Sequence, residues 1–332
     1  MLRVVAGILF LLASVFAHAP VIPAGASKPV GPYSPGIDAG DMLYVSGQGA
    51  RAADGSLADG IAAQTRQALR NVKAVLEAGG VTPQHVVAVQ FYLDDVKNLP
   101  EADKVYREFF PKDAPARVVV GVSRMPTGTP VEINAVAVKD LSKKRVTPAG
   151  VWAGDRLYLN AIVAPTLVAA QRQLEIAIRQ AGLPRRSLVS QLTFNTGKTF
   201  FADVPVAGLP GGAKAALFAV AARDAGELLR TGCRSTGNTL YCETRSAEAA
   251  GTIEAQTRGL FAKLQERVEA HGFHLADIVA SNVWLNDLDQ FQAMNAVYAT
   301  YFPAAPPTRT TVQPAAKSAT APGIRISIVA VR

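Results

Sequence analysis

Cysteine and histidine are scarce in this chain of 332 residues, which contains two cysteines and four histidines. Two cysteines exclude a small fold that depends on several disulfides. Charged residues make up only 18% of the chain and hydrophobic residues 49%, which excludes a charge-rich disordered protein. With 27 glycines and 21 prolines, the sequence is neither fibrous nor of low complexity. The composition is that of a globular protein, long enough for about two domains of ordinary size.

Motifs for common cofactors, metals and nucleic acids are also missing. The sequence has no dinucleotide fingerprint and no G-x-S-x-G segment. His271 and His274 lie close together, but no cysteine or acidic cluster completes a metal-binding set. The net charge of +8 permits acidic partners, yet the only basic clusters are at 143–145 and 185–186, without interleaved aromatic residues. We therefore expect no cofactor, no metal and no specific nucleic-acid partner.

Residues 1–19 have the pattern of a secretory signal peptide. Arg3 precedes an apolar run from Val4 to Ala17, which at about 14 residues is shorter than the roughly 20 that a membrane-spanning helix needs. The small residues Ala17 and Ala19 each offer a cleavage site. We expect an exported protein, periplasmic or secreted, with no membrane span after cleavage. An uncleaved leader that remains as an anchor is the alternative.

The two cysteines flank a candidate hairpin. A two-residue turn at Gly237 and Asn238 would place Cys233 opposite Cys242, in a non-hydrogen-bonded pair where side chains approach most closely. A disulfide there suits an oxidising compartment. Two buried free thiols are the equal alternative.

Internal repeats are the most informative feature of the sequence. The segment AQTR occurs at 63–66 and again at 255–258, and with the same offset of 192 Arg117 matches Arg309. A Gly-Asp or Gly-Asn turn within alternating apolar residues occurs three times, at 39–45, 153–159 and 236–242. Such self-similarity indicates three tandem units.

The three units are expected at 20–141, 145–224 and 228–332. The end of the middle unit aligns with that of the first at an offset of 84, whereas the hairpins align at 114, so about 30 residues are missing. The loss falls on the loop before the first helix and on the second helix. The middle unit is therefore degenerate and shortened.

Hydrophobic periodicity predicts an α+β unit with the order β-β-α-β-α-β-β. Asp59 is available as the cap of the first helix, and Gly79 and Gly80 as its end. The elements expected in the first unit are a hairpin near 36–47, helices at 61–78 and 99–110, and strands at 85–93, 117–123 and 131–138.

Several segments of the first unit resemble the Rid family, also called RidA, YjgF or endoribonuclease L-PSP. They are GPYSPG at 31–36, LYVSGQ at 43–48, AQTRQALRNVKAVLEAGG at 63–80, PAR at 115–117 and VEINAVAV at 131–138. The resemblance implies a chorismate mutase-like fold that forms trimers with ligand clefts between subunits. Three units in one chain therefore predict an intramolecular pseudo-trimer that is monomeric as a chain.

The resemblance also implies an activity, the hydrolysis of 2-imino or enamino acids to 2-keto acids and ammonia, as in a 2-iminobutanoate/2-iminopropanoate deaminase. Arg117 can bind the substrate carboxylate through two parallel hydrogen bonds, and Glu132 can activate water. By the resemblance, Tyr33 closes the cleft, Gly47 offers a backbone approach and Asp103 stands where the family often has Asn. Val119 stands where many members have Cys or Thr.

The other units depart from this pattern. The third keeps Arg309 and has Asn295 at the position of the family's Asn, but Arg325 replaces the glutamate. The middle unit aligns Phe201 with Arg117 and Ala216 with Glu132, so it has neither group. We expect at most one or two working clefts. A binding or sensing module for a small carboxylate is the alternative to an enzyme, and an endoribonuclease ranks last.

Overall fold

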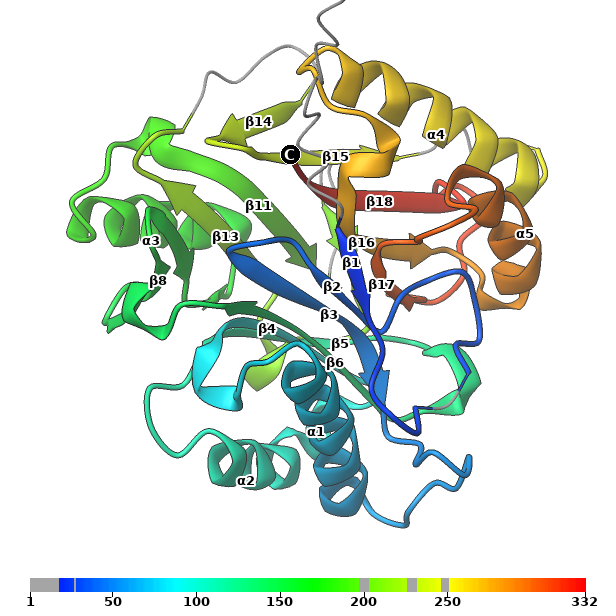
Figure 1. Cartoon of the computed structure of the whole chain (residues 1–332). Helices are drawn as coiled ribbons and strands as arrows, with labels where there is room; N and C mark the ends of the chain where they lie inside the picture. Colours follow the sequence, from blue (N-terminus) through cyan, green and yellow to red (C-terminus); the bar gives the residue numbers. More distant parts are fainter. Residues whose placement is uncertain (1–17, 27, 197–202, 226–231, 246–250) are drawn as a thin grey trace, which may run out of the picture.

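The computed structural model of the chain describes residues 18–26, 28–196, 203–225, 232–245 and 251–332. Three β-sheets lie around a common centre and their helices lie on the outside (Figure 1). Each sheet takes its strands from one of the three repeats, so the α+β class and the threefold arrangement are confirmed. The expected leader falls largely outside the described residues, among which no helix has the length and apolarity needed to cross a bilayer.

The first sheet matches the predicted order, with one added strand. Ala19, which we assigned to the leader, lies in this extra strand, β1, and Nε2 of His18 hydrogen-bonds the Val331 carbonyl oxygen at 2.7 Å. The N-cap of α1 is Gly60, with φ 81°, so the expected cap at Asp59 is wrong by one residue. The elements are β1 (Ala19–Val21), β2 (Gly36–Asp38), β3 (Met42–Gly49), α1 (Ile61–Ala78), β4 (Val86–Leu93), α2 (Leu99–Phe109), β5 (Ala116–Gly121) and β6 (Val131–Val138).

The third sheet repeats this plan without the added strand. In its hairpin Cys233 pairs with Cys242 in the register expected from the turn, and the two cysteines form a disulfide. The elements are β14 (Cys233–Thr236), β15 (Thr239–Arg245), α4 (Ile253–Glu269), β16 (Ile278–Leu285), α5 (Phe291–Tyr301), β17 (Thr308–Val312) and β18 (Ile324–Val331).

Among its described residues, the middle unit has one α-helix, α3, where each neighbouring unit has two. Residues 197–202, between β11 and β12, lie outside the described residues, so the loss of the second helix stays a prediction. The α3 side chains Val168 and Ile176 are 62% and 46% exposed. The elements are β7 (Lys144–Thr147), β8 (Gly150–Ala153), β9 (Arg156–Leu159), β10 (Ile162–Ala164), α3 (Leu167–Gln180), β11 (Leu188–Asn195), β12 (Val204–Pro205) and β13 (Ala215–Ala222).

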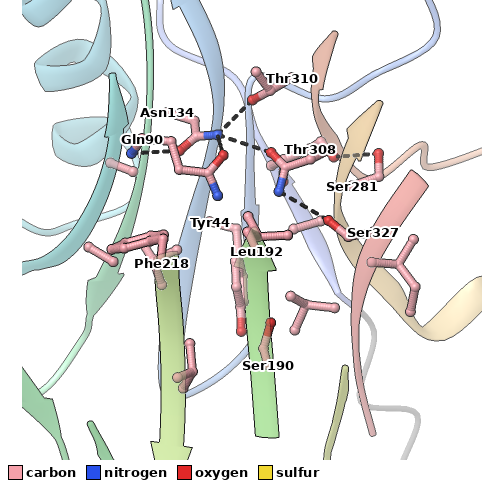
Figure 2. Close-up of a pocket in the computed structure, with 18 of the residues that line it drawn as sticks. Tyr44, Gln90, Asn134, Ser190, Leu192, Phe218, Ser281, Thr308, Thr310 and Ser327 are labelled. Atoms are coloured by element: carbon pink, nitrogen blue, oxygen red, sulfur yellow. Dashed lines mark hydrogen bonds between the residues drawn. The ribbon is translucent and has the colours of Figure 1, made fainter. Parts of the chain in front are cut away.

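Alternation along the strands divides the interior into an outer core under the helices of each unit and one central core. In β6 the residues Val131, Ile133 and Ala135 face the helices, whereas Val136 faces the centre. The central core includes Tyr92, Phe194 and Trp284 from corresponding strand positions of the three units. The inner faces also enclose a cavity, which Figure 2 shows.

Backbone hydrogen bonds join all three units where their edge strands end. Gly121 donates to Gly208 O at 2.9 Å, Ser123 to Gln313 O at 2.9 Å, and Ala207 to Pro314 O at 2.8 Å. These residues lie at or just after the ends of β5, β12 and β17, the last strand before the final strand in each unit. The three repeats therefore form one closed structure.

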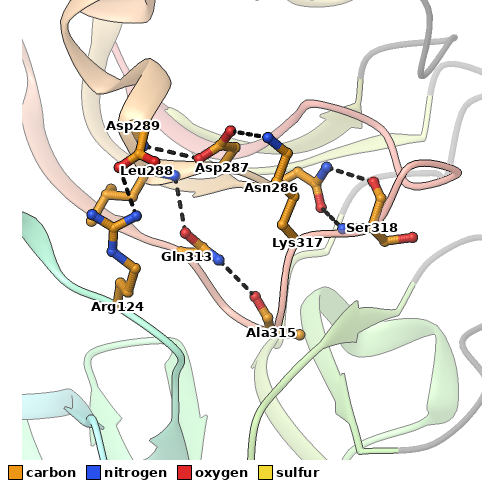
Figure 3. Close-up of polar contacts among 9 residues, drawn as sticks. All are labelled: Arg124, Asn286, Asp287, Leu288, Asp289, Gln313, Ala315, Lys317 and Ser318. Atoms are coloured by element: carbon orange, nitrogen blue, oxygen red, sulfur yellow. Dashed lines mark hydrogen bonds and ion pairs between the residues drawn. The ribbon is translucent and has the colours of Figure 1, made fainter.

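Side chains strengthen the contact between the first and third units. Nη1 of Arg124 in the first unit lies 2.7 Å from Oδ1 of Asp289 in the third (Figure 3). Within the third unit, the main-chain N–H of Leu288 donates at 3.0 Å to Oε1 of the buried Gln313, whose carbonyl oxygen accepts from Ser123 of the first unit. Asp287, two residues before Asp289, forms an ion pair with Lys317 within the third unit. This contact lies beside the cleft that the same two units form.

Candidate active site

A cleft of about 150 Å³ lies between the first and third units. It forms because β17, the edge strand of the third sheet, packs beside β3 of the first. The inner face of the first sheet and the outer face of β17 both contribute side chains to it. The most informative of them are Tyr33, Gly47, Glu132, Phe291, Arg309 and Thr311.

Glu132 is the acidic group of the cleft. Its neighbours Val131 and Ile133 pack under the helices of the first unit, so the Glu132 side chain projects from the opposite face and is 6% exposed. Burial raises the pKa of Glu132 to about 8, although the charge of Arg309 opposes the rise. Gly47 makes room for the carboxyl group, since a Cβ there would lie 1.9 Å from Oε1.

Arg309 is the basic group of the cleft and is 4% exposed. Its guanidinium carbon lies 4.7 Å from the ring centre of Tyr298, 5.5 Å from that of Phe291 and 5.6 Å from that of Tyr33. Burial lowers the pKa of Arg309, while the charge of Glu132 is among the causes that oppose this. Aromatic rings thus hold the guanidinium, which remains available to a ligand.

The segment that carries Tyr33 connects the two units. Ser34 donates from its side chain to Pro306 O at 2.7 Å, and Ser46 donates to Ser34 O at 2.6 Å. The Ser46 hydroxyl also accepts a hydrogen bond from the main-chain N–H of Arg309 at 2.9 Å. These contacts set the position of β17 relative to β3 and therefore of Arg309 relative to Glu132.

Buried polar atoms without a partner gather at this site. Both terminal nitrogens of Arg309, both amide atoms of Asn295 and the hydroxyl of Thr311 are buried and make no hydrogen bond to the described residues. Gly31 passes close above them, since a Cβ there would lie 2.5 Å from Nη2 of Arg309 and 2.9 Å from Nδ2 of Asn295. Buried polar groups normally have partners, so this set is arranged for a ligand. A planar guanidinium and an amide suit a carboxylate.

The structure does not bring Arg117 and Glu132 together, so their expected pairing is wrong. Arg117 lies on the helix-facing side of β5, where its guanidinium carbon is 4.0 Å from the ring centre of Tyr106. Glu132 lies on the opposite face of the same sheet. The basic partner of Glu132 is Arg309, from another unit.

Asp103 also lies outside the cleft. Its Oδ1 atom lies 2.6 Å from Nη2 of Arg117 and its Oδ2 atom 2.6 Å from Nη2 of Arg107. The two arginines hold the pKa of Asp103 below its usual value, despite the opposing effect of its burial. Asp103 therefore neutralises Arg117, whereas the corresponding Asn295 leaves the charge of Arg309 free.

Thr311, Phe291 and Ser46 are residues at the cleft that the sequence analysis missed. Thr311 lies 192 residues after Val119, so the repeat offset that relates Arg117 to Arg309 could have found it. Ser46 lies within the recognised segment at 43–48, but no pattern indicated its contact with β17. The first unit has Val119 at the position where the family often has Cys or Thr. At the cleft, the third unit supplies a Thr at this position, Thr311.

The positions that correspond to this cleft between the second and third units carry different groups. Nη1 of Arg325 donates to the Asp203 carbonyl oxygen at 2.7 Å. Phe201, which corresponds to Arg309 there, lies outside the described residues. Between the first and second units, Ala216 of β13 takes the position of Glu132 on the side of β5, and it is buried with no acidic group to offer. In the described part of the chain, no three His, Cys, Asp or Glu residues are grouped to hold a metal ion.

The chain is similar in sequence to several known proteins. The family model described as endoribonuclease L-PSP matches residues 24–139 and 235–331. The RutC family protein PH0854 of Pyrococcus horikoshii is 44% identical over 117 residues, which are 35% of this chain and 93% of that protein. The 2-iminobutanoate/2-iminopropanoate deaminase of Salmonella typhimurium is 36% identical over 114 residues, 33% of this chain and 89% of that enzyme. The crystal structure of the YjgF gene product from E. coli is 34% identical, with a TM-score of 0.35, and covers 37% of this chain and 99% of that one.

Proposed function

This chain belongs to the endoribonuclease L-PSP family, and we propose that it is a hydrolase that converts 2-imino and 2-enamino acids to 2-keto acids and ammonia. Relatives named as imine deaminases support the reaction type. The observation that carries the proposal is the buried guanidinium of Arg309, free at both terminal nitrogens, beside a glutamate whose pKa is raised to about 8. One site per chain performs the reaction.

Arg309 binds the substrate carboxylate. Its two free terminal nitrogens offer parallel hydrogen bonds, and Asn295 and Thr311 add polar contacts beside them. Tyr33 and Phe291 exclude water from the bound carboxylate, because their rings lie within 5.6 Å of the guanidinium carbon. Arg309 thereby places the substrate C2 carbon toward Glu132.

Glu132 transfers the protons. In its neutral form, which dominates near pH 7 when the pKa is about 8, it donates its proton to the imine nitrogen. The resulting carboxylate takes a proton from water as the water oxygen bonds to C2. Glu132 then returns that proton to the amino group, ammonia leaves, and the carboxylate takes the hydroxyl proton as the keto group forms. Glu132 ends as it began, and one water is consumed.

The burial of Arg309 disfavours a ribonuclease activity. A polymer backbone cannot easily reach a guanidinium that is 4% exposed and covered by three aromatic rings. A small carboxylate can. The substrate or product partner of this cleft is therefore a small imine, enamine or 2-keto acid.

We also propose that the chain is exported and acts as a monomer. The disulfide between Cys233 and Cys242 supports export, because such bonds persist in oxidising compartments. The closed ring of backbone hydrogen bonds supports a monomer, because each unit already has two neighbours. Light scattering tests whether the chain is a monomer. Isolation of the protein from the periplasm or the medium, with a non-reduced mass that includes the disulfide, tests export.

The test of the activity generates an imine from an amino acid with an amino-acid oxidase and follows 2-keto acid release. We expect the wild type to accelerate release and both Arg309→Lys and Glu132→Gln to lose the acceleration. Arg117→Lys is the matched control and retains it, because Arg117 lies in another part of the chain. Saturable binding of a 2-keto acid without acceleration by the wild type would instead support a binding module.

A further inference from the structure

A second cavity, of about 100 Å³, lies at the centre of the molecule, where the inner faces of the three sheets meet (Figure 2). Three tyrosines line it from the three corresponding hairpins: Tyr44, Tyr158 and Tyr241. Arg309 borders both this cavity and the cleft described above, but its guanidinium lies in the cleft. The central cavity is thus a separate space.

One wall of the central cavity is polar. Nδ2 of Asn134 donates to Thr310 Oγ1 at 2.8 Å and, at 3.2 Å each, to Oδ1 of Asn282 and Oε1 of Gln90. Tyr92 also donates to Oε1 of Gln90, at 2.6 Å. Nε2 of Gln90 has no partner among the described residues, and its amide points into the cavity (Figure 2). This wall presents a free hydrogen-bond donor.

The opposite wall is mostly apolar, because the middle unit has apolar residues where the first unit has an amide pair. Gln90 pairs with Asn134 across the first sheet, whereas the corresponding pair in the middle sheet is Leu192 and Phe218. Around this pair the wall offers few polar groups, Ser190 among them, whereas a buried water needs two to four polar partners. A homotrimer would repeat one pair three times, but a single chain can combine polar and apolar pairs. The cavity therefore suits a molecule with one polar and one apolar part.

The tyrosine end of the cavity favours negative charge. The hydroxyls of Tyr44 and Tyr241 are buried, and neither completes a hydrogen bond of standard geometry with the described residues. Arg156 does not itself line the cavity, but its guanidinium interacts with both hydroxyls, and its charge opposes the rise in the Tyr44 pKa that burial causes. No Asp or Glu is among the described residues that line the cavity. A basic group, hydroxyl donors and no acid together attract an anion.

We propose that the central cavity binds a small aliphatic carboxylate, with its charge toward the hydroxyls of Tyr44 and Tyr241, which lie near Arg156, and its alkyl part against Leu192 and Phe218. An engineered cavity of about 150 Å³ holds the six carbons of benzene, so this smaller one takes a ligand of about four to five heavy atoms. The inference does not depend on the proposed deaminase activity, because the cleft and the central cavity use different polar groups.

The test titrates the full chain with propionate, which has five heavy atoms, by calorimetry. Arg309→Gln removes the guanidinium of the cleft, so the binding that this variant retains reports the central cavity, with one equivalent expected. On that background Ser190→Leu fills the cavity from the wall of the middle unit and abolishes binding. Tyr241→Phe removes one hydroxyl and weakens binding about tenfold. Tyr106→Phe is the matched control with no change, since its hydroxyl is also buried and unpartnered but lies under the helices of the first unit.

The proposal fails if Arg309→Gln shows no saturable binding up to roughly 50 mM propionate, a range that covers millimolar affinity. It also fails if Ser190→Leu and Tyr241→Phe leave the affinity unchanged. Thermal unfolding checks that each variant is folded. Should Ser190→Leu not fold, the difference between Tyr241→Phe and Tyr106→Phe decides.

Discussion

Two arginines at corresponding positions of the first and third units have different environments. Arg309 is enclosed by aromatic rings beside a neutral Asn295, and both of its terminal nitrogens are free. Arg117 has the same kind of ring, Tyr106, but the carboxylate of Asp103 occupies its Nη2 atom. Glu132 of the first unit lies in the same cleft as Arg309. The middle unit, which packs next to β5 and so next to Arg117, has Ala216 at the position of Glu132. The units thus share one fold, but the polar groups at their interfaces differ.

This difference shows what a covalent trimer permits. In a homotrimer each substitution appears three times, so a change that ends catalysis in one cleft ends it in all. In a single chain the third unit supplies Arg309, Asn295 and Thr311, the first supplies Glu132, and the other interfaces can change. The interface near Arg117 has become a partly buried ion pair, a structural contact in place of a ligand site.

The largest expected effect comes from changing each arginine in turn. Arg309→Lys removes the planar fork that binds a carboxylate through two hydrogen bonds, and we expect kcat/KM to fall about a thousandfold, or about 4 kcal/mol. Arg117→Lys should stay within about twofold of the wild type. Imine hydrolysis kinetics measure both. Equal losses in the two variants would mean that the interface near Arg117 also takes part.

The raised pKa of Glu132 predicts a dependence of stability on pH. The unfolded chain releases this proton near the ordinary pKa of 4.5, while the folded chain holds it until about pH 8. The free energy of unfolding therefore falls as the pH rises between these values, by roughly 3 kcal/mol from pH 5 to pH 7. Glu132→Gln should remove the part of this pH dependence that comes from Glu132.

Denaturant titrations of wild type and Glu132→Gln at several pH values measure the slope. The wild-type kcat/KM should also decline above about pH 8, because Glu132 then lacks the proton that it donates. Asp103→Asn is a contrasting variant. Because the pKa of Asp103 is lowered, this substitution should change the pH dependence of stability in the acid range. Parallel stability curves for wild type and Glu132→Gln would contradict the assignment of the proton to Glu132.

An isosteric exchange would give Arg309 the environment of Arg117. Asn295→Asp places a carboxylate where Asp103 lies beside Arg117, so it should neutralise the guanidinium and lower kcat/KM about a hundredfold, mainly through KM. The reverse change, Asp103→Asn, should leave the activity unaltered. Activity that survives in Asn295→Asp would show that the free charge of Arg309 is not what binds the substrate.

Most of the fold could be predicted from the sequence, because periodicity and repeats are local signals. The helix at Ile61–Ala78 and the pairing of Cys233 with Cys242 were predicted to the residue. The site could be predicted only in part. Alternation along β6 would have placed Glu132 away from the helix-facing side, but which unit packs against that inner face is a tertiary property. The pairing of Glu132 with Arg309 instead of Arg117 therefore needed the structure, and so did the contact of Ser46 with β17.

The smallest expected effect is that of the ion pair between Arg124 and Asp289, which lies beside the cleft and not in it. Arg124 and Asp289 are 50% and 73% exposed, so their ion pair between the first and third units should contribute only about 0.5 kcal/mol. Gln313 is 6% exposed and accepts from the Leu288 N–H, so Gln313→Ala should cost more, about 1 to 2 kcal/mol. A double-mutant cycle over Arg124→Ala and Asp289→Ala, read by denaturant unfolding, measures the ion pair. A coupling energy above about 2 kcal/mol would mean that this exposed pair holds the two sides of the cleft together, in place of the backbone hydrogen bonds between the units and the contacts of Ser34 and Ser46.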